Sequence, residues 1–282
     1  MYMKQKTSKK WRGRDAVLLA IALLFFIGFA LWQNNDLTLT QYTAATAKDV
    51  PKEGLKIVQV SDLHNKSFGK QNEKLLSRIR EQNPDLILMT GDAADCRRTD
   101  IEVVLDFLAA ATEIAPVYYV SGNHENRLRI DRKTALYAGL RESGVQILND
   151  ETQTVSVRGC EIVLLGLDDA HLAGGTLQTL CEDLPENTLQ ILLAHEPQEL
   201  TNYAAAGVDF VFSGHTHGGQ VRLPFVGGLA APDQGLFPQY DAGEFTENKT
   251  VLYVSRGLGN SLFPVRVLNR PELVCVTVTA EE

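Results

Sequence analysis

The sequence predicts an α/β fold, and three observations lead to that prediction. From residue 54 onward, short apolar runs alternate with stretches of helical spacing, as in sheets whose strands are connected by helices. The first three apolar runs each end in a polar loop that contains Asp62, Asp92 or Asn123. These three residues are 30 and 31 positions apart, about the length of one strand–helix–strand unit, so they occupy equivalent places in successive units.

Each expected element follows from its own local pattern. The helix expected at 72–82 places Leu75, Leu76 and Ile79 on one face and ends before Pro84. The helix expected at 100–113 has Asp100 in the capping position, and a third helix is expected at 197–206. Strands are expected where apolar runs are bounded by turn residues, at 55–60, 86–89, 117–120, 152–157, 161–165, 189–193, 208–212, 251–255 and 273–278.

An apolar segment near the amino terminus predicts a membrane anchor. Ala16 to Trp32 is uncharged over 17 residues, and six basic residues precede it. As a helix it would measure about 25 Å, at the short end for a bilayer. A cleaved secretory signal is the alternative, but its apolar core is usually shorter. Because basic flanks stay inside, we expect 1–15 to be cytoplasmic, 16–33 to be a single transmembrane anchor in the cell membrane, 34–52 to be a linker without folded structure, and 53–282 to be an extracytoplasmic domain.

Charge and cysteine usage exclude two kinds of site. Residues 53–282 carry 19 Lys and Arg against 32 Asp and Glu, a formal charge of −13. Nucleic-acid-binding surfaces are basic, so no nucleic-acid partner is expected. The four cysteines are far apart and form no Cys-x-x-Cys pair, which argues against a cysteine zinc site and leaves their disulfide state open.

Two closely spaced histidines, His215 and His217, follow the apolar run at 208–212. Such a pair suits a metal site, although alone it is more often a loop or core feature. Asp62 and His64 have the same two-residue spacing, and the carboxyl ends of strands are where ligands bind in open α/β sheets. His171 is expected to be a loop residue or helix cap rather than a substrate contact. The other five histidines lie in loops after strands, at positions 64, 124, 195, 215 and 217.

Five blocks of residues carry a resemblance to a known family. In chain order they are Asp62-x-His64, Gly91-Asp92-x-x-Asp95, Gly122-Asn123-His124-Glu125, His195 and Gly214-His215-x-His217. Together they resemble the complete signature of the calcineurin-like metallophosphoesterases. Glu125 takes a place that is often Asp in that pattern. The stretches at 218–224 and 253–259 resemble the membrane-associated or exported bacterial branch of the same superfamily.

The resemblance implies a four-layer αββα sandwich and two divalent metal ions. It assigns Asp62, His64 and His217 to one ion and Asn123, His195 and His215 to the other, with Asp92 bridging both. This mixed donor set suits Mn, Fe or Zn better than Mg. The resemblance also makes His124 a catalytic residue beside Asp92, contacting the phosphate or protonating the leaving oxygen. Asp95 and Glu125 would orient histidines.

Two further features of the sequence each allow a functional and a purely structural interpretation. Arg97, Arg98 and Arg127 are candidates for gripping a substrate phosphate, but each, like Arg129, also reads as a solvated surface residue. The stretch from Leu223 to Tyr240 is rich in Gly, Pro and exposed-type apolar residues. It is expected either to cover the core or to border the site and dip toward a bilayer beside lipid-linked substrates.

Three functions of different kinds fit the sequence. The favoured one is a metal-dependent phosphoesterase at the outer face of the membrane, acting on a phosphate mono- or diester of an envelope lipid, nucleotide-sugar or wall polymer. A non-catalytic metal-binding scaffold is the second, but such proteins usually lose the bridging carboxylate or the Asn-His pair, and this chain keeps both. A nuclease is the third, and the negative charge and membrane anchor argue against it.

Overall fold

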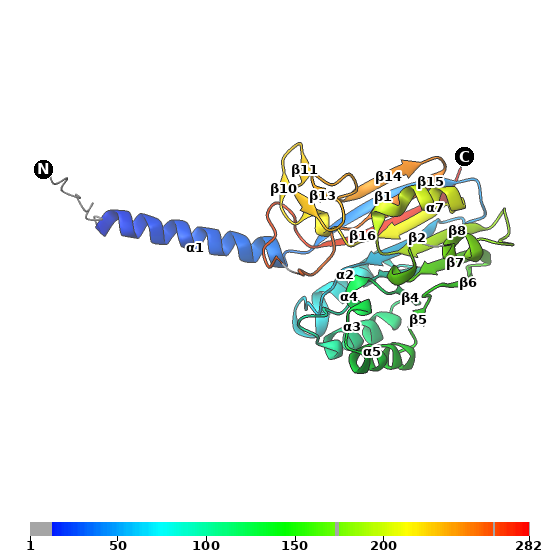
Figure 1. Ribbon diagram of the computed structural model, residues 1–282, viewed down its shortest axis with the longest axis horizontal. Helices are drawn as coiled ribbons and strands as arrows, with labels where there is room; N and C mark the ends of the chain where they lie inside the picture. Colours follow the sequence, from blue (N-terminus) through cyan, green and yellow to red (C-terminus); the bar gives the residue numbers. More distant parts are fainter. Residues whose placement is uncertain (1–12, 173–174, 262, 282) are drawn as a thin grey trace, which may run out of the picture.

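Two six-stranded sheets packed face to face form the centre of the molecule (Figure 1). The computed structural model describes residues 13–172, 175–261 and 263–281. Helices cover the outer face of each sheet, which confirms the expected four-layer αββα sandwich. A single long helix, α1 (Gly13–Asn35), extends away from the sandwich at one end.

The first sheet contains the three strands that precede Asp62, Asp92 and Asn123, whose regular spacing predicted the α/β fold. Its strand order is β1 (Thr38–Thr46), β16 (Glu272–Ala280), β2 (Leu55–Val60), β3 (Leu86–Thr90), β4 (Val117–Val120) and β5 (Gln146–Ile147). The strands from β2 to β5 run parallel. Its outer face is covered by α2 (Glu73–Gln82), α3 (Ile101–Thr112) and α5 (Ile130–Glu142).

The second sheet has the order β14 (Gly243–Glu247), β15 (Thr250–Val254), β9 (Phe210–Ser213), β8 (Leu189–Ala194), β7 (Cys160–Leu167) and β6 (Glu151–Val157). Its outer face is covered by the short helices α6 (Thr176–Leu180) and α7 (Leu200–Ala206). Two small hairpins, β10 (Arg222–Leu223) with β11 (Gly227–Gly228) and β12 (Ala230–Ala231) with β13 (Gly235–Leu236), lie between β9 and β14 in the chain. We call residues 221–240 the hairpin lobe.

The apolar runs seen in the sequence form the core between the two sheets. Ile57 and Leu88 of the first sheet and Ile191 and Phe212 of the second are all fully buried there. Every residue of β3 and β8 is buried. Strands covered on both faces read as continuous apolar runs, and for this reason they were visible in the sequence.

The prediction that residues 34–52 form an unstructured linker is wrong for Thr38–Thr46. These nine residues form β1, which pairs in parallel with the whole of β16 and gives the first sheet its edge. Tyr42 and Ala44 pack against the core between the sheets. The threonines of β1 are β-branched, and β-branched residues are enriched in strands. Because one side of this edge strand is solvated, its residues are largely polar and resemble those of a linker. Its pairing partner is more than 200 residues away in the chain, so no local sequence pattern indicates the pairing.

Helix α1 is the one helix in the described ranges that is long and apolar enough to cross a membrane. Its best 18-residue window has a mean hydropathy of 2.4, and its apolar side chains are exposed. Of the basic residues that were expected to flank it, Arg14 lies in its first turn, whereas Lys4, Lys6, Lys9, Lys10 and Arg12 lie outside the described residues.

Candidate metal centre

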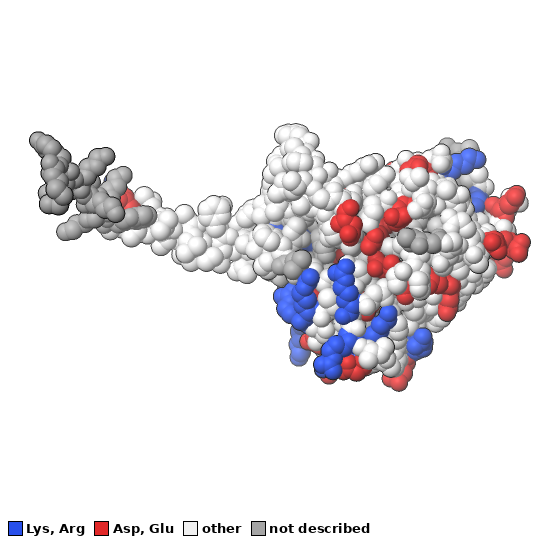
Figure 2. Space-filling model, in the orientation of Figure 1, with Lys and Arg blue, Asp and Glu red and all other residues white. Residues whose placement is uncertain are grey.

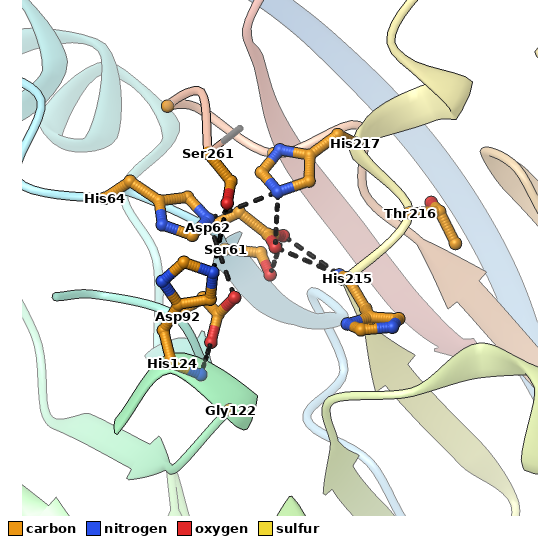
Figure 3. Close-up of polar contacts among 12 residues, drawn as sticks. Ser61, Asp62, His64, Asp92, Gly122, His124, His215, Thr216, His217 and Ser261 are labelled. Atoms are coloured by element: carbon orange, nitrogen blue, oxygen red, sulfur yellow. Dashed lines mark hydrogen bonds and ion pairs between the residues drawn. The ribbon is translucent and has the colours of Figure 1, made fainter. Parts of the chain in front are cut away.

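The residues singled out in the sequence meet where strands of both sheets end. Asp62 follows β2, Asp92 follows β3, Asn123 follows β4, His195 follows β8 and His215 follows β9. The buried side chain of Gln59 fixes these ends relative to one another. Its amide donates to Thr90 Oγ1 at 3.0 Å and, across to the other sheet, to the Ser213 carbonyl at 2.8 Å. Figure 3 shows the resulting convergence of side chains.

Five of these residues have a left-handed backbone. Their φ angles are 50° for Asp62, 46° for His64, 52° for Asp92, 69° for His215 and 49° for His217. This conformation costs a non-glycine residue on the order of 1 kcal/mol or more and concentrates at functional sites. The sharp turns aim each side chain back toward the gap between the sheets. Gly214 allows the closest approach, because a Cβ there would lie 1.9 Å from Ser61 Oγ.

One group of donor atoms is formed by Asp62, His64 and His217, all of them buried. His217 Nε2 lies 3.2 Å from His64 Nε2 and 3.6 Å from Asp62 Oδ1. The Asp62 carboxylate is held in place by the Ser61 hydroxyl at 2.7 Å and by the His215 backbone amide. Two ring nitrogens and a carboxylate oxygen thus face a common point (Figure 3).

A second group surrounds Asp92. Its Oδ2 atom lies 3.5 Å from His64 Nε2 and 3.4 Å from His195 Nε2, so this carboxylate stands between two histidines that the sequence assigned to different ions. Its Oδ1 atom accepts the His124 backbone amide at 2.8 Å. His195 Nδ1 contacts the Thr90 carbonyl at 2.8 Å and must donate to it, so Nε2 is the ring nitrogen that remains for a metal ion.

Several buried donor atoms in these groups have no hydrogen-bond partner. Two of them, His195 Nε2 and Asn123 Oδ1, belong to one proposed ligand group, whereas His64 Nδ1 is on the side of the ring that faces Asp95. A buried polar atom without a partner costs roughly 1–3 kcal/mol, so such atoms call for an explanation. Imidazole nitrogens and carboxylate and amide oxygens facing one gap fit a divalent metal ion, which would satisfy them.

The protonation states of three histidines and of Asp92 also suit metal binding, whereas, against the lowering effect of burial, the Asp92 carboxylate raises the pKa of His195 well above its ordinary value. Burial lowers the pKa of His64 and of His215 to about 4 and takes the pKa of His217 well below its ordinary value, so these rings are neutral near pH 7. Burial alone would raise the pKa of Asp92, but the neighbouring His195 outweighs it and leaves that pKa below its ordinary value. Neutral imidazole and ionised carboxylate are the forms that bind metal.

His124 lies beside the two groups and points into a cavity of about 160 Å³. Its Nδ1 atom accepts the Cys96 backbone amide at 3.2 Å, so Nε2 carries the hydrogen and contacts Ser261 Oγ at 3.0 Å. Burial lowers the pKa of His124. The cavity is also lined by Asp92, Asn123, His215 and His217, so a ligand there meets an imidazole N–H next to the proposed metal ligands.

Asp95 and Glu125 make different contacts from one another. Asp95 Oδ2 lies 3.7 Å from His64 Nδ1, on the side where it can orient that ring. The hydrogen bonds of Glu125 go instead to backbone amides, those of Asp92 and Gly122 at 2.9 Å and Ala94 at 2.8 Å. The expectation that Glu125 orients a histidine is therefore wrong: it fixes the backbone of the two loops that carry Asp92 and Asn123.

The arginine candidates are only partly near the cavity. Arg97 reaches Ser261 Oγ at 3.4 Å, and Arg98 contacts the carbonyls of Asn260 and Ser261 at 3.3 Å. Arg127 is exposed and does not line the cavity. His171 is the last residue of the short 3-10 helix Asp169–His171, is exposed and pairs with Asp150.

Three residues that contact the site were not predicted from the sequence. Ser261 contacts His124, Asp233 Oδ2 lies 2.9 Å from His215 Nε2, and the fully buried Arg266 lies behind His217, with Nη2 3.5 Å from its Nδ1. All three come from loops after the five blocks, without a motif of their own. Because Asp233 accepts from His215 Nε2, the lone pair of that ring is on Nδ1.

Known proteins provide the decisive comparison. A family model described as calcineurin-like phosphoesterase matches residues 55–219, more than half of the chain. The chain belongs to the calcineurin-like phosphoesterase family. It is thus a metal-dependent phosphoester hydrolase, and the buried donor groups described above are the candidate sites for its divalent metal ions.

Relatives of this calcineurin-like phosphoesterase cover most of its length. It is 32% identical over 287 residues to "Uncharacterized metallophosphoesterase YkuE" of Bacillus subtilis (strain 168), covering 98% of this chain and 99% of the relative. It is 29% identical to "Phosphodiesterase YaeI" of Escherichia coli (strain K12), over 77% of this chain and 80% of the relative. It is 28% identical to the bovine "Transmembrane protein with metallophosphoesterase domain", over 86% of this chain and 59% of the relative.

Proposed function

We propose that this chain binds two divalent metal ions and hydrolyses a phosphate mono- or diester at the outer face of the cell membrane. The proposed ligands fall into two groups that share the carboxylate of Asp92: Asp62, His64 and His217 for one ion, and Asn123, His195 and His215 for the other. The observation that carries the proposal is that Asp62, His64 and His217, and Asp62, Asp92 and His195, form buried donor groups beside a cavity that Asp92, Asn123, His215 and His217 line. The mixed donors favour Mn, Fe or Zn.

The protein's own groups have separate tasks in the proposed reaction. Bound divalent ions lower the pKa of a water and offset the charge of phosphoryl oxygens. The ionised Asp92 holds the two ligand groups together and fixes the His124 backbone. His124 Nε2–H, now in contact with Ser261, donates to a phosphoryl oxygen or to the leaving oxygen. Arg97 and Arg98, beside Ser261, are placed to contact a negatively charged substrate that extends past it.

The membrane location rests on α1 and on the basic residues that precede it. With the basic flank in the cytoplasm, the domain would lie outside, among envelope lipids, nucleotide-sugars and wall polymers. These phosphoesters form the proposed substrate class.

The full-length protein in detergent tests the activity. We expect it to hydrolyse bis-p-nitrophenyl phosphate or p-nitrophenyl phosphate with Mn²⁺ present, to lose turnover on treatment with EDTA, and to regain it when Mn²⁺ is returned. His215→Ala should remove most of the turnover, because it deletes a proposed ligand. No turnover of either ester with Mn²⁺, Zn²⁺ or Fe²⁺, or full turnover in EDTA, would contradict the proposal.

A further inference from the structure

Exposed apolar side chains gather at one end of the domain. Outside α1, the described residues include eight large apolar side chains that are exposed, and only Ile130 stands apart from the rest. Phe225 is the most exposed, with the full area of a free side chain, and Leu236 and Phe237 are 69% and 59% exposed. The seven residues of this apolar surface come from the hairpin lobe and the loop that follows β15: Leu223, Phe225, Val226, Leu236, Phe237, Phe263 and Leu268.

Direct contacts place this apolar surface at the end of α1. Gln33 Oε1 accepts the backbone amide of Asn269, next to Leu268, and Asn34 Oδ1 accepts the side-chain amide of Asn260. Arg222 at the start of the hairpin lobe donates its backbone amide to the Val267 carbonyl, so the lobe is attached to the same loop. In Figure 1 the labels β10, β11 and β13 stand beside the domain end of α1.

The carboxyl-terminal end of α1 has residues that are typical of a membrane interface. The Arg270 guanidinium lies 5.4 Å from the ring centroid of Trp32 and also pairs with Asp36. Tryptophan is enriched where a spanning helix leaves the apolar layer. If α1 crosses a bilayer, residues 268–270 are therefore held at the depth of the lipid headgroups, and the hairpin lobe beside them is at the same depth.

The hairpin lobe suits that environment. Within residues 221–240 only Arg222 and Asp233 are charged; Arg222 pairs with Asp241, and the exposed Asp233 carboxylate pairs with the buried His215. Figure 2 shows a lobe without charged residues above the end of α1 and a group of Lys and Arg residues below it. An apolar surface flanked by basic residues is typical of elements that lie in the interface of a bilayer with anionic lipids.

The same surface forms part of the mouth of the catalytic cavity. Phe263 is 56% exposed and also lines the cavity, together with Ala230 and Pro232 of the hairpin lobe. Asn123 and His124 line the same cavity. A phosphoester in this cavity would therefore have its apolar part next to the surface that faces the membrane.

We propose that the hairpin lobe and the loop at 263–268 lie in the headgroup region of the membrane that α1 spans, and that the cavity takes a phosphoester of a membrane lipid directly from it. The substrate half of this proposal rests on the proposed function, whereas the membrane contact does not. A second protein is the competing occupant of an apolar surface of this kind. The attachment of the surface to the end of α1 favours the bilayer, because the anchor brings the two together in every molecule.

Tryptophan fluorescence of the full chain in vesicles tests the membrane contact. We expect Phe225→Trp to add fluorescence that brominated phospholipids quench, beyond the quenching of the unsubstituted protein. Lys249→Trp is the matched control, since it lies in the exposed turn between β14 and β15, at the end of these strands that is far from α1 (Figure 1). Equal quenching of the two added tryptophans, or cross-linking of two copies through position 225 without quenching, would overturn the proposal.

A pair of esters with the same leaving group tests the substrate. We expect the double variant F225E/F237E to hydrolyse dioleoylphosphatidyl-p-nitrophenol in vesicles about tenfold more slowly than the unsubstituted protein, because charged side chains are driven out of the interface. Its rate on water-soluble bis-p-nitrophenyl phosphate should not change, and F225L/F237L should keep both rates. An equal rate of F225E/F237E and the unsubstituted protein on the lipid ester would overturn the lipid substrate. Inactivity of the unsubstituted protein on both esters would instead count against the proposed phosphoesterase function.

Discussion

Replacing Asp92 by Asn is expected to lower the turnover of bis-p-nitrophenyl phosphate by about 10³-fold, the upper range for loss of one preorganised electrostatic group. The substitution keeps the shape of the side chain and an oxygen that can accept the His124 amide, 2.8 Å away. It removes the negative charge that lies within 3.5 Å of both His64 and His195. The loss should therefore appear in kcat and in metal content while the fold is kept.

Asp85→Asn is the matched control for this substitution. Asp85 directly precedes the strand that Asp92 follows, and its carboxylate accepts the Lys56 amide and pairs with Arg158 at the opposite end of the sheet. Such a partly exposed pair contributes about 1 kcal/mol or less to stability. We expect Asp85→Asn to retain full turnover. Comparable losses in the two variants would mean that Asp92 has only a structural role.

Replacing Glu125 by Ala is expected to lower the free energy of unfolding by roughly 3–9 kcal/mol, because three buried backbone N–H groups lose their acceptor at about 1–3 kcal/mol each. These amides belong to Asp92, Ala94 and Gly122. The change should appear as a fall of the thermal midpoint by about 10 °C or more. Turnover should fall as well, since the same amides position Asp92 and Asn123.

Thermal unfolding in the presence of EDTA separates this effect from metal loss. Glu113→Ala is the control: Glu113 is an exposed glutamate at the end of α3, where substitution usually changes stability by less than about 0.5 kcal/mol. Glu125→Gln should be intermediate, since it keeps one acceptor oxygen but brings an NH₂ group against a donor. If Glu125→Ala unfolds at the temperature of Glu113→Ala, the role given to Glu125 is wrong.

The site residues that could be predicted from the sequence are those that follow regularly spaced strands. Asp62, Asp92 and Asn123 recur with the strand–helix period, and parallel strands bring such residues to one edge of a sheet. The strands themselves were visible because both faces of β3 and β8 are covered, so all but one residue of each, Thr90 and Gln190, are apolar. The fold class and the neighbourhood of the ligands therefore followed from local patterns alone.

The missed features depend on contacts between distant parts of the chain. Strand β1 has a mixed polar pattern, and its partner β16 is at the other end of the sequence. Helix α5 was not predicted because only Leu136 and Leu140 of its 13 residues are buried, too few to give a helical period. Asp233 reaches the site from the turn between β12 and β13, and Ser261 and Arg266 from an irregular loop that contacts the hairpin lobe and the end of α1.

The number of metal ions bound per chain tests the central claim most directly. Elemental analysis of the purified full-length protein by plasma mass spectrometry, after growth with Mn²⁺ and Zn²⁺, should find about two divalent ions per chain, as in two-metal phosphoester hydrolases. His217→Ala removes a ligand from one group only, so it should retain about one. An unsubstituted protein with one ion or none, or a His217→Ala protein with the unsubstituted metal content, would contradict the binuclear site proposed for these residues.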